Sequence, residues 1–300
     1  MKLARMWAIT KVVLFGHVFN WLWRPHERRR DVRGNVILRV VPKYLKRYLP
    51  ATGKVPDTKP INDDENEKIW TIWLQGEESA PELVKACFRS IRRHCKQELV
   101  VLDDTNIFDY ITLPREIVKK YKQGKIKHAH FADICRVELL YEHGGIWMDA
   151  TCFVTGAIPD WLIEQDFFVY MYDVGRYKYS FMQNCFIRAR RGAYLLAAWR
   201  EMIHEYWKNE DGVVEYFMHQ LMFKTLVEND ARAKKYFKKM PHVSQVAAHA
   251  LWWDYGDKPF DRKVWDKITA ESFWQKTNYK SPWVKDIIPG TFADFVVNKA

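Results

Sequence analysis

Alternating apolar and polar positions mark the first predicted strand of this 300-residue chain. Residues 68–75, KIWTIWLQ, alternate over the length of a strand, and Gly76 ends the run. Residues 81–94 place apolar side chains at helical spacing, with Ser79 as the expected N-cap and basic residues in the last turn. Residues 98–102 form a second short apolar run. Strand, helix and strand in this order predict a βαβ unit, whose parallel strands leave a crevice at their carboxyl edge.

Helical spacing recurs further along the chain. Residues 113–123 and 131–142 are predicted helices, and Gly144 is the expected C-terminal cap of the second. Residues 146–148 then begin a strand that delivers Asp149 to the edge of the sheet. Three later segments are also predicted to be helical: residues 193–208, 213–228 and 231–239. The pattern predicts an α/β fold, with a Rossmann-related parallel sheet, helices on both faces and a helical C-terminal part.

The basic character of the chain resides in its first 54 residues. The formal net charge is +11, and residues 1–54 contain thirteen Lys or Arg and two acids, which leaves 35 bases and 35 acids for the rest. We therefore divide the chain into an arm (residues 1–54), a linker rich in Pro and acids (55–67) and a folded body (68–300). Residues 55–300 are neutral as a whole, so a generally anionic partner is not indicated for this part of the chain.

The arm begins with an apolar stretch, residues 6–23, that is too short and too interrupted by Lys11 for a membrane-spanning helix. It also lacks the small-residue cleavage site of a signal peptide. Because a basic cluster follows at Arg24 and residues 28–30, we predict an interfacial anchor on an anionic membrane surface. The alternatives are packing on the body or on a second subunit, and nucleic-acid binding, for which no motif is present.

The cysteines favour a reduced, cytosolic setting. They are odd in number and form neither a CxxC pair nor a cluster with histidines at metal-ligand spacing. They are Cys87, Cys95, Cys135, Cys152 and Cys185.

Two features of residues 130–151 are candidates for chemistry. Asp149 follows an apolar strand that two glycines introduce, and its carboxylate is the kind of ligand that Mg²⁺ and Mn²⁺ prefer. Asp133 and Arg136 are three residues apart on one helix face. From spacing alone the pair is an intrahelical salt bridge, worth a few tenths of a kcal/mol. A single acid at a strand end is also common, so neither feature identifies a site without the other.

The whole string HAHFADICRVELLYEHGGIWMDAT, residues 128–151, resembles a known sugar-binding region. The family includes bacterial capsular polysaccharide synthesis enzymes, fungal initiating mannosyltransferases and, more distantly, the glucosyltransferase domains of large clostridial toxins. Its pattern runs A-x-x-S/A-D-x-x-R, a stretch of helix, and then G-G-x-Y/W-x-D-x-D/T. The step of sixteen residues from Asp133 to Asp149 matches. The matching positions are Ala132, Asp133, Arg136, Leu140, Gly144, Gly145, Trp147 and Asp149.

The resemblance implies roles for individual residues. Asp133 would bind hydroxyls of the donor sugar, Arg136 would contact the sugar or the diphosphate, and Asp149 would hold the metal and the ribose. These three are the candidate catalytic residues. In IWTIWLQG, Trp73 would stack on the nucleobase, with Trp70 as the less favoured candidate and the core as the alternative location for Trp73.

Further matches to this family lie outside that string. In SFMQNCFIRARRG, Asn184 would reach the donor sugar, with Gln183 beside it, although Asn184 could also be an ordinary strand-end residue. The segment VVEYFMHQ resembles a capsule-type Y-F-x-x-H feature on the acceptor side. Alternatively, Glu215 and His219, four residues apart on a helix, could simply pair with each other. The residues concerned are Glu215, Tyr216, Phe217 and His219.

The resemblance also implies a divalent cation, Mn²⁺ or Mg²⁺. Thr151 stands where many relatives have a second Asp, and a neutral hydroxyl is a weaker ligand than a carboxylate. The metal would then be held by Asp149 and Thr151, through water, or with a residue from elsewhere. Candidates in AAHALWWDYGD are His249, Asp254 and Asp257, although this aromatic-rich segment is as readily explained by packing.

The resemblance therefore implies a GT-A-like fold and a metal-dependent hexosyltransferase. A UDP- or GDP-sugar would donate a glycosyl group, with retention of configuration, to a hydroxyl of a glycan in capsule or other cell-surface polysaccharide synthesis. The acceptor glycan would be free or linked to a lipid. With the arm, this predicts a cytoplasmic enzyme at the inner face of the plasma membrane. The alternatives are a sugar-phosphate transferase of capsule assembly and an inactive glycan-binding protein.

Overall fold

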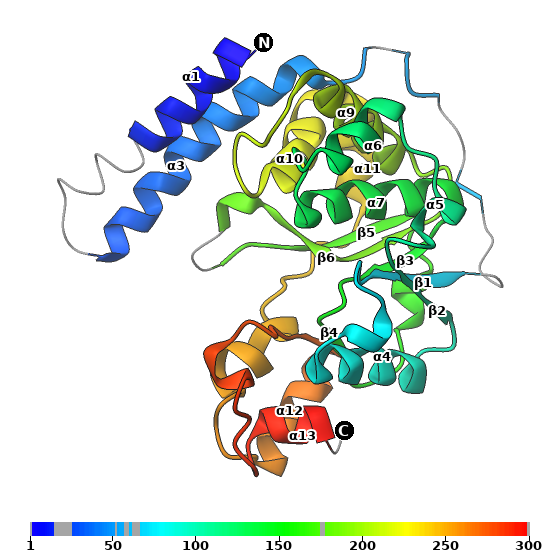
Figure 1. The fold of residues 1–300 in the computed structure, drawn as a ribbon, viewed down its shortest axis with the longest axis vertical. Coiled ribbons are helices and arrows are strands. Elements are labelled where there is room, and N and C mark those ends of the chain that lie inside the picture. The colour runs from blue at the N-terminus through cyan, green and yellow to red at the C-terminus, as the bar shows by residue number, and fades with distance from the viewer. Residues whose placement is uncertain are drawn as a thin grey trace.

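A five-stranded sheet lies at the centre of the computed structural model (Figure 1). The structure describes residues 2–14, 26–51, 53–56, 60–61, 67–174 and 178–298, without the side chains of residues 2 and 26–32. The strand order is β2-β1-β3-β6-β5. The strands are β1 (Lys68–Ile72), β2 (Glu98–Leu102), β3 (Gly145–Met148), β5 (Phe167–Met171) and β6 (Met182–Ala189).

Three of these strands form the predicted parallel unit. Strand β1 pairs in parallel with β2 on one side and with β3 on the other. Strand β6, however, is antiparallel to both β3 and β5, so the sheet is mixed and not purely parallel. Only residues 172–181 connect β5 to β6. Neighbouring parallel strands need a longer crossover, so this connection returns the chain antiparallel.

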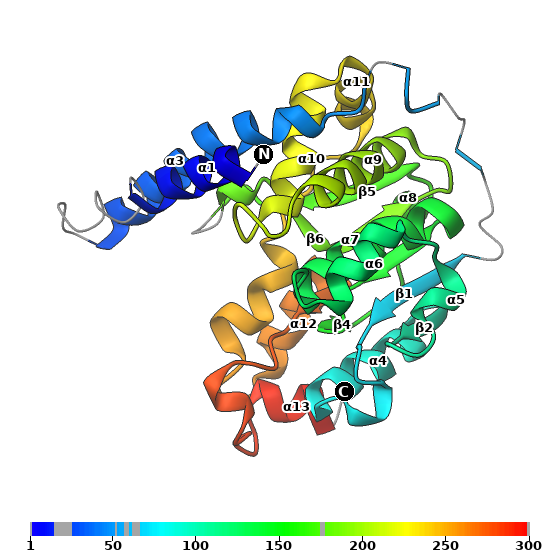
Figure 2. The same ribbon diagram turned by 45° about the horizontal axis from the view of Figure 1, so that its top comes forward.

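Helices cover both faces of the sheet, which confirms the predicted α/β layering (Figures 1 and 2). Helix α7 (His128–His143) lies over β1, β3 and β6, and α9 (Tyr194–Asn209) and α10 (Met218–Asn229) continue that layer. Helix α4 (Glu82–His94) covers the other face. The remaining helices of the body are α5 (Ile107–Tyr110), α6 (Arg115–Lys122), α8 (Asp160–Ile163), α11 (Ala231–Lys239), α12 (Arg262–Glu271) and α13 (Phe292–Asn298).

One predicted N-cap and one predicted helix start are wrong. Helix α4 has Pro81 at its N-cap, and the Ser79 hydroxyl instead donates to the carbonyl of Gln75 at 2.7 Å. Helix α10 begins only at Met218, so residues 213–217 are not helical. Glu215 therefore does not form the helical pair with His219 that was considered above. Its carboxylate lies 3.6 Å from the guanidinium of Arg33 on the N-terminal arm.

The C-terminal part packs beside α4 around a small antiparallel sheet (Figure 1). This sheet pairs β4 (Cys152–Val154) with β7 (Trp274–Lys276), and Lys276 is the register partner of Cys152. Because β4 directly follows the turn that contains Asp149, this pairing carries Lys276 to the same turn.

Among its described residues, the N-terminal arm contains the α-helices α1 (Lys2–Val13) and α3 (His26–Leu45). Buried side chains of the second half of α3, such as Ile37 and Val41, share one hydrophobic cluster with the body. The hydroxyl of Tyr48, just beyond α3, donates to the buried carboxylate of Glu210 at 2.6 Å. Part of the arm therefore belongs to the core, while the basic cluster at residues 24–30 lies outside the described side chains. No described helix is long and apolar enough to span a membrane.

Candidate functional site

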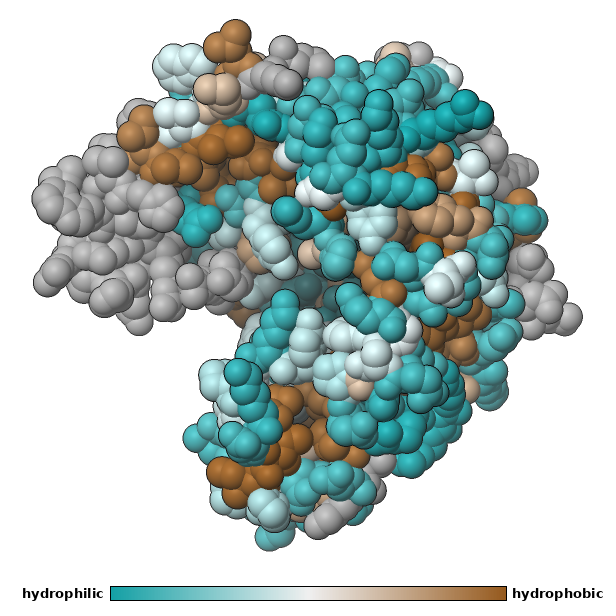
Figure 3. Space-filling model, viewed as in Figure 1, coloured by the Kyte–Doolittle hydropathy of each residue, from teal (hydrophilic) through white to brown (hydrophobic). Residues whose placement is uncertain are grey.

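A cavity of about 400 Å³ opens at the carboxyl ends of β1 and β3. Figure 3 shows a hollow between the C-terminal part and the rest of the molecule. The cavity brings together most of the residues that the sequence analysis selected, from segments far apart in the chain. These are Trp73, Asp133, Arg136, Asp149, Thr151, Gln183, Asn184, Tyr216 and Phe217. Their roles remain predictions, but their common location is now a structural fact.

The glycine pair places Asp149 in this cavity. Gly144 and Gly145 both have positive φ, at 70° and 100°, and a Cβ at Gly145 would lie 2.4 Å from the carbonyl oxygen of Lys68 on β1. Only glycine allows this conformation and this close approach of β3 to β1. After β3, the indole N–H of Trp147 donates to Asp149 Oδ1 at 2.9 Å. The carboxylate is thus oriented by its own strand.

Asp133 and Arg136 form the predicted intrahelical salt bridge, with 3.2 Å between Nη2 and Oδ1. The same guanidinium lies 3.5 Å from Asp149 and donates to the backbone carbonyl of Asn184 at 2.5 Å. The side-chain amide of Asn184 donates to Asp133 Oδ1 at 2.8 Å. The pair is therefore one part of a network that joins α7, β3 and β6.

His219 borders this network from α10. Its Nδ1 lies 3.9 Å from Asp133 Oδ1 and 3.4 Å from the amide nitrogen of Asn184. Burial lowers the pKa of His219 to about 3, so the imidazole is neutral at neutral pH. Burial alone would raise the pKa of Asp133. The imidazoles of His219 and His130 and the guanidinium of Arg136 outweigh burial and lower this pKa to about 2. Asp133 is therefore an ionised acceptor.

Aromatic side chains form one wall of the cavity. Trp73 and Tyr279 meet edge to face, with ring centroids 5.3 Å apart, and both line the cavity. The buried indole N–H of Trp73 has no acceptor among the described residues. Trp70, in contrast, is 2% exposed and donates to the carbonyl of Gly144 at 2.9 Å, so it belongs to the core.

The residues around Asp149 do not fit the predicted divalent cation in this arrangement. The ammonium of Lys276 donates to Asp149 Oδ2 at 2.9 Å and to Thr151 Oγ1 at 2.5 Å, so it joins the two predicted ligands. Burial disfavours both charged forms, but each charge stabilises the other. The pKa of Asp149 is therefore lowered and the pKa of Lys276 is raised. Within the described residues, no group of three or more His, Cys, Asp or Glu side chains could hold a metal ion.

The proposed additional ligands do not reach this place. His249 is buried outside the cavity lining, with Nδ1 3.0 Å from the carbonyl of Gln245 and its ring 4.6 Å from that of Trp253. Asp254 and Asp257 are exposed and do not line the cavity either. Mn²⁺ or Mg²⁺ thus remains a prediction without a matching set of ligands.

Sequence reasoning missed Lys276 and Tyr279. Lys276 ends β7, which was not predicted as a strand, and Tyr279 follows three residues later. The available signal was the short run FWQK, whose aromatic residues and flanking turn residues are typical of a strand. Its pairing with β4 could not be inferred from the run itself.

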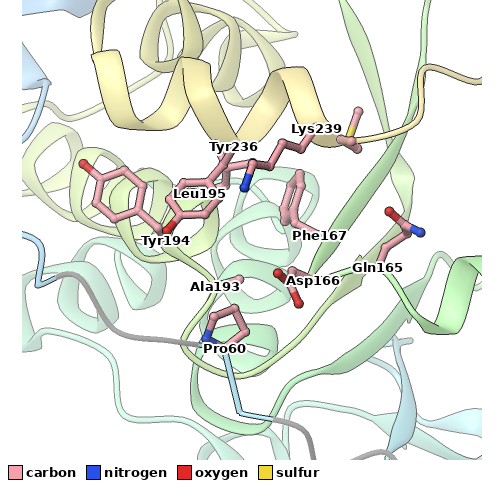
Figure 4. Close-up of a pocket in the computed structure, with 10 residues that line it drawn as sticks. Pro60, Gln165, Asp166, Phe167, Ala193, Tyr194, Leu195, Tyr236 and Lys239 are labelled. Carbon is pink, nitrogen blue, oxygen red and sulfur yellow. The ribbon is translucent and has the colours of Figure 1, made fainter.

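A second, smaller cavity of about 100 Å³ lies between the start of α9, the end of α11 and Pro60 (Figure 4). None of the residues selected from the sequence lines it. Its one carboxylate, Asp166, lies 3.5 Å from the guanidinium of Arg190. This cavity offers no comparable set of converging polar groups.

Comparison with known proteins agrees with the resemblance found in the sequence. The chain is similar to glycosyltransferase afumC of Aspergillus fumigatus, with 25% identity over 184 residues, which is 55% of this chain and 46% of that protein. It is also similar to O-glycosyltransferase braB of Annulohypoxylon truncatum, with 27% identity over 184 residues, which is 54% of this chain and 42% of that protein. Each match thus spans less than half of the relative's length.

Among solved structures, the PaToxG glycosyltransferase aligns with 70% of this chain and 85% of its own, with a TM-score of 0.37 and 14% identity. A family model described as capsular polysaccharide synthesis protein matches residues 23–294, which include most of the arm and nearly all of the body. The chain belongs to the capsular polysaccharide synthesis protein family.

Proposed function

We propose that this protein is a glycosyltransferase that moves a sugar from a UDP- or GDP-sugar to a hydroxyl of a glycan acceptor in capsule or other cell-surface polysaccharide synthesis. The observation that carries the proposal is the network of Asp133, Arg136, Asp149 and Asn184 in one cavity beside Trp73. The family and the names of the two relatives support the same reaction class.

The polar network would recognise the donor sugar. Asp133 is ionised and accepts hydrogen bonds, so its carboxylate is suited to hold sugar hydroxyls. Asn184 adds an amide from the facing strand, already oriented by Asp133 at 2.8 Å. Two groups fixed by each other hold a ligand with little loss of side-chain entropy, which favours a defined orientation of the anomeric carbon.

The aromatic wall would bind the nucleobase. Trp73 presents an apolar face and an N–H without a described partner, and Tyr279 lies against it. Such rings stack on bases of either kind, so this wall is compatible with both UDP- and GDP-sugars. Arg136 would then lie between the sugar and the diphosphate, where its charge stabilises the departing nucleoside diphosphate. The resemblance to the family implies retention of configuration.

The proposal is tested by a screen of UDP- and GDP-sugars with glycan acceptors, including lipid-linked ones, in which the released nucleotide is identified. We expect release of a nucleoside diphosphate from one donor. Asp133→Asn and Arg136→Lys should each reduce turnover by about 10²-fold or more, because each removes a group positioned at the transferred sugar or leaving group. The exposed Asp109→Asn serves as the matched control and should retain full turnover.

Two other results of the screen would favour the alternatives. Release of a nucleoside monophosphate would indicate a sugar-phosphate transferase. Donor binding without turnover across the acceptor panel would indicate an inactive glycan-binding protein.

We further propose that α1 places the enzyme on the inner face of the plasma membrane. Leu3 and Trp7 on this helix are 76% and 64% exposed, while Ala8 and Val12 are buried in the cluster shared with the body. Figure 3 shows apolar side chains gathered over this helix. An exposed aromatic and aliphatic surface beside basic residues suits an anionic lipid interface.

Flotation with anionic vesicles tests this location. Trp7→Ser should reduce the bound fraction, because an exposed indole contributes to interfacial binding. The control is Trp161→Ser, which changes an indole that is 40% exposed elsewhere on the body. Equal flotation of both variants and the wild type would rule out this role for α1.

A further inference from the structure

Lys276 occupies the place between the two side chains that were predicted to hold a metal. Its ammonium lies 2.9 Å from Asp149 Oδ2 and 2.5 Å from Thr151 Oγ1. The other oxygen of Asp149 accepts from the indole of Trp147 at 2.9 Å and lies 3.5 Å from the guanidinium of Arg136. Both oxygens of the carboxylate therefore already face positive or donor groups of the protein.

The backbone fixes this position of Lys276. The residue closes β7, in register with Cys152 on β4. The next residue, Thr277, bonds to the carbonyl of Thr151 twice, through its backbone N–H at 2.8 Å and its hydroxyl at 2.9 Å. The stem of Lys276 thus begins beside the Asp149 turn whichever rotamer it adopts.

The ammonium also reaches the cavity. Lys276 lines the same cavity as Trp73, Asp133 and Arg136, and its side chain is 23% exposed. An ammonium has three N–H donors. Asp149 and Thr151 accept two of them, and no described residue accepts the third, which remains available to an anionic oxygen in the cavity.

A divalent cation at this place would have an unfavourable environment. Mg²⁺ is usually held by one or two carboxylates together with substrate phosphates and waters. Here the carboxylate of Asp149 has both oxygens engaged by Lys276 and Trp147, and Thr151 offers only a neutral hydroxyl that also faces Lys276, so a cation would have to displace the ammonium. The cation would also stand close to the charges of Lys276 and Arg136, which would repel it.

We propose that Lys276 supplies the positive charge at the donor diphosphate that a divalent cation would otherwise supply, so that this enzyme transfers sugar without a divalent cation. The inference rests on the proposed glycosyltransferase function. The bond between the anomeric carbon and the diphosphate oxygen breaks, and its electron pair passes to that oxygen. A bond forms between the anomeric carbon and the acceptor oxygen, whose proton passes to the released nucleoside diphosphate. Lys276 donates a hydrogen bond to the diphosphate while negative charge accumulates on the diphosphate oxygen.

The test measures binding of UDP and GDP, and turnover of the donor found in the screen, in EDTA and in Mn²⁺ or Mg²⁺. We expect the wild type to bind and turn over within about twofold under all conditions. In EDTA, Lys276→Met should lower affinity by about tenfold and turnover by about 10²-fold or more, because it removes a donor to the leaving group. Lys276→Arg should retain more of both than Lys276→Met. The control, Lys267→Met, changes an exposed lysine on α12 and should leave both unchanged.

The possible outcomes separate the two proposals. If EDTA abolishes wild-type binding or turnover and Mn²⁺ restores it, or if Lys276→Met equals the wild type in EDTA, the role of Lys276 is refuted while the glycosyltransferase function stands. If neither nucleotide binds and no donor is turned over with or without metal, both proposals fail. Should Lys276→Met not fold, the metal response of the wild type and the turnover of Lys276→Arg still decide.

Discussion

Replacing Gly145 by alanine should break the contact between β1 and β3 that places Asp149. Gly145 has φ of +100°, and an added Cβ would lie 2.4 Å from the carbonyl oxygen of Lys68 and 3.3 Å from its backbone nitrogen. The unfavourable φ costs about 1–2 kcal/mol for a residue with a side chain. Relief of the clash must move β3 away from β1, and losing two backbone hydrogen bonds there adds about 2 kcal/mol. We therefore expect Gly145→Ala to lower the free energy of unfolding by about 3–4 kcal/mol.

The assay is urea unfolding followed by tryptophan fluorescence, because a change in stability shifts the midpoint at constant slope. Gly124→Ala is the matched control: its φ is +69°, but a Cβ there would meet no atom within 4 Å. It should therefore show only the conformational cost of about 1–2 kcal/mol. Equal losses for the two variants would refute the argument from close strand approach. Gly145→Ala should also weaken donor binding, since Asp149 lies at the end of the same strand.

Two further predictions concern buried charges away from the cavity. Burial opposes the charge of Glu138, but His204 and Arg200 outweigh this effect and lower the pKa of the carboxyl below its usual 4.5. The ionised carboxylate therefore stabilises the fold above pH 4.5, and this stabilisation is lost as the pH falls through the lower pKa of the native state. Glu138→Gln should therefore flatten the dependence of the unfolding free energy on pH below 4.5, and an unchanged slope would contradict this. Tyr48→Phe removes the donor 2.6 Å from buried Glu210 and should lower the unfolding free energy by about 1–3 kcal/mol in urea; no change would show that the bond contributes nothing.

Local sequence signals were sufficient wherever one segment determines its own geometry. The i, i+3 spacing of Asp133 and Arg136 predicted their contact, and it forms at 3.2 Å. Gly144 was predicted to cap the helix that precedes β3, and it follows α7 with φ of 70°. The βαβ unit was also predictable, because its strands and helix follow one another with short connections.

Sheet direction was not predictable in the same way. Strand β5, FFVYM, is a continuous apolar run, and such a run indicates burial without specifying a partner or a direction. Its antiparallel pairing with β6 follows from the connection between them, because residues 172–181 are too few for the crossover that a parallel neighbour needs. The resemblance to a family identified the polar residues of β6 but not the orientation of the strand that carries them.

The surroundings of Asp149 show why local ligand spacing is an incomplete guide to a charged site. The segment from Gly144 to Thr151 specifies which oxygens face the cavity, but the charge that balances them comes from Lys276, 127 residues after Asp149. That contact depends on the register of β7 against β4, and a shift by one residue would replace the ammonium by Gln275 or Thr277. An acid at a strand end can bind a metal or pair with a lysine, and only the partner strand distinguishes the two. The response to EDTA therefore tests a feature of the tertiary fold, and not only of the sequence motif.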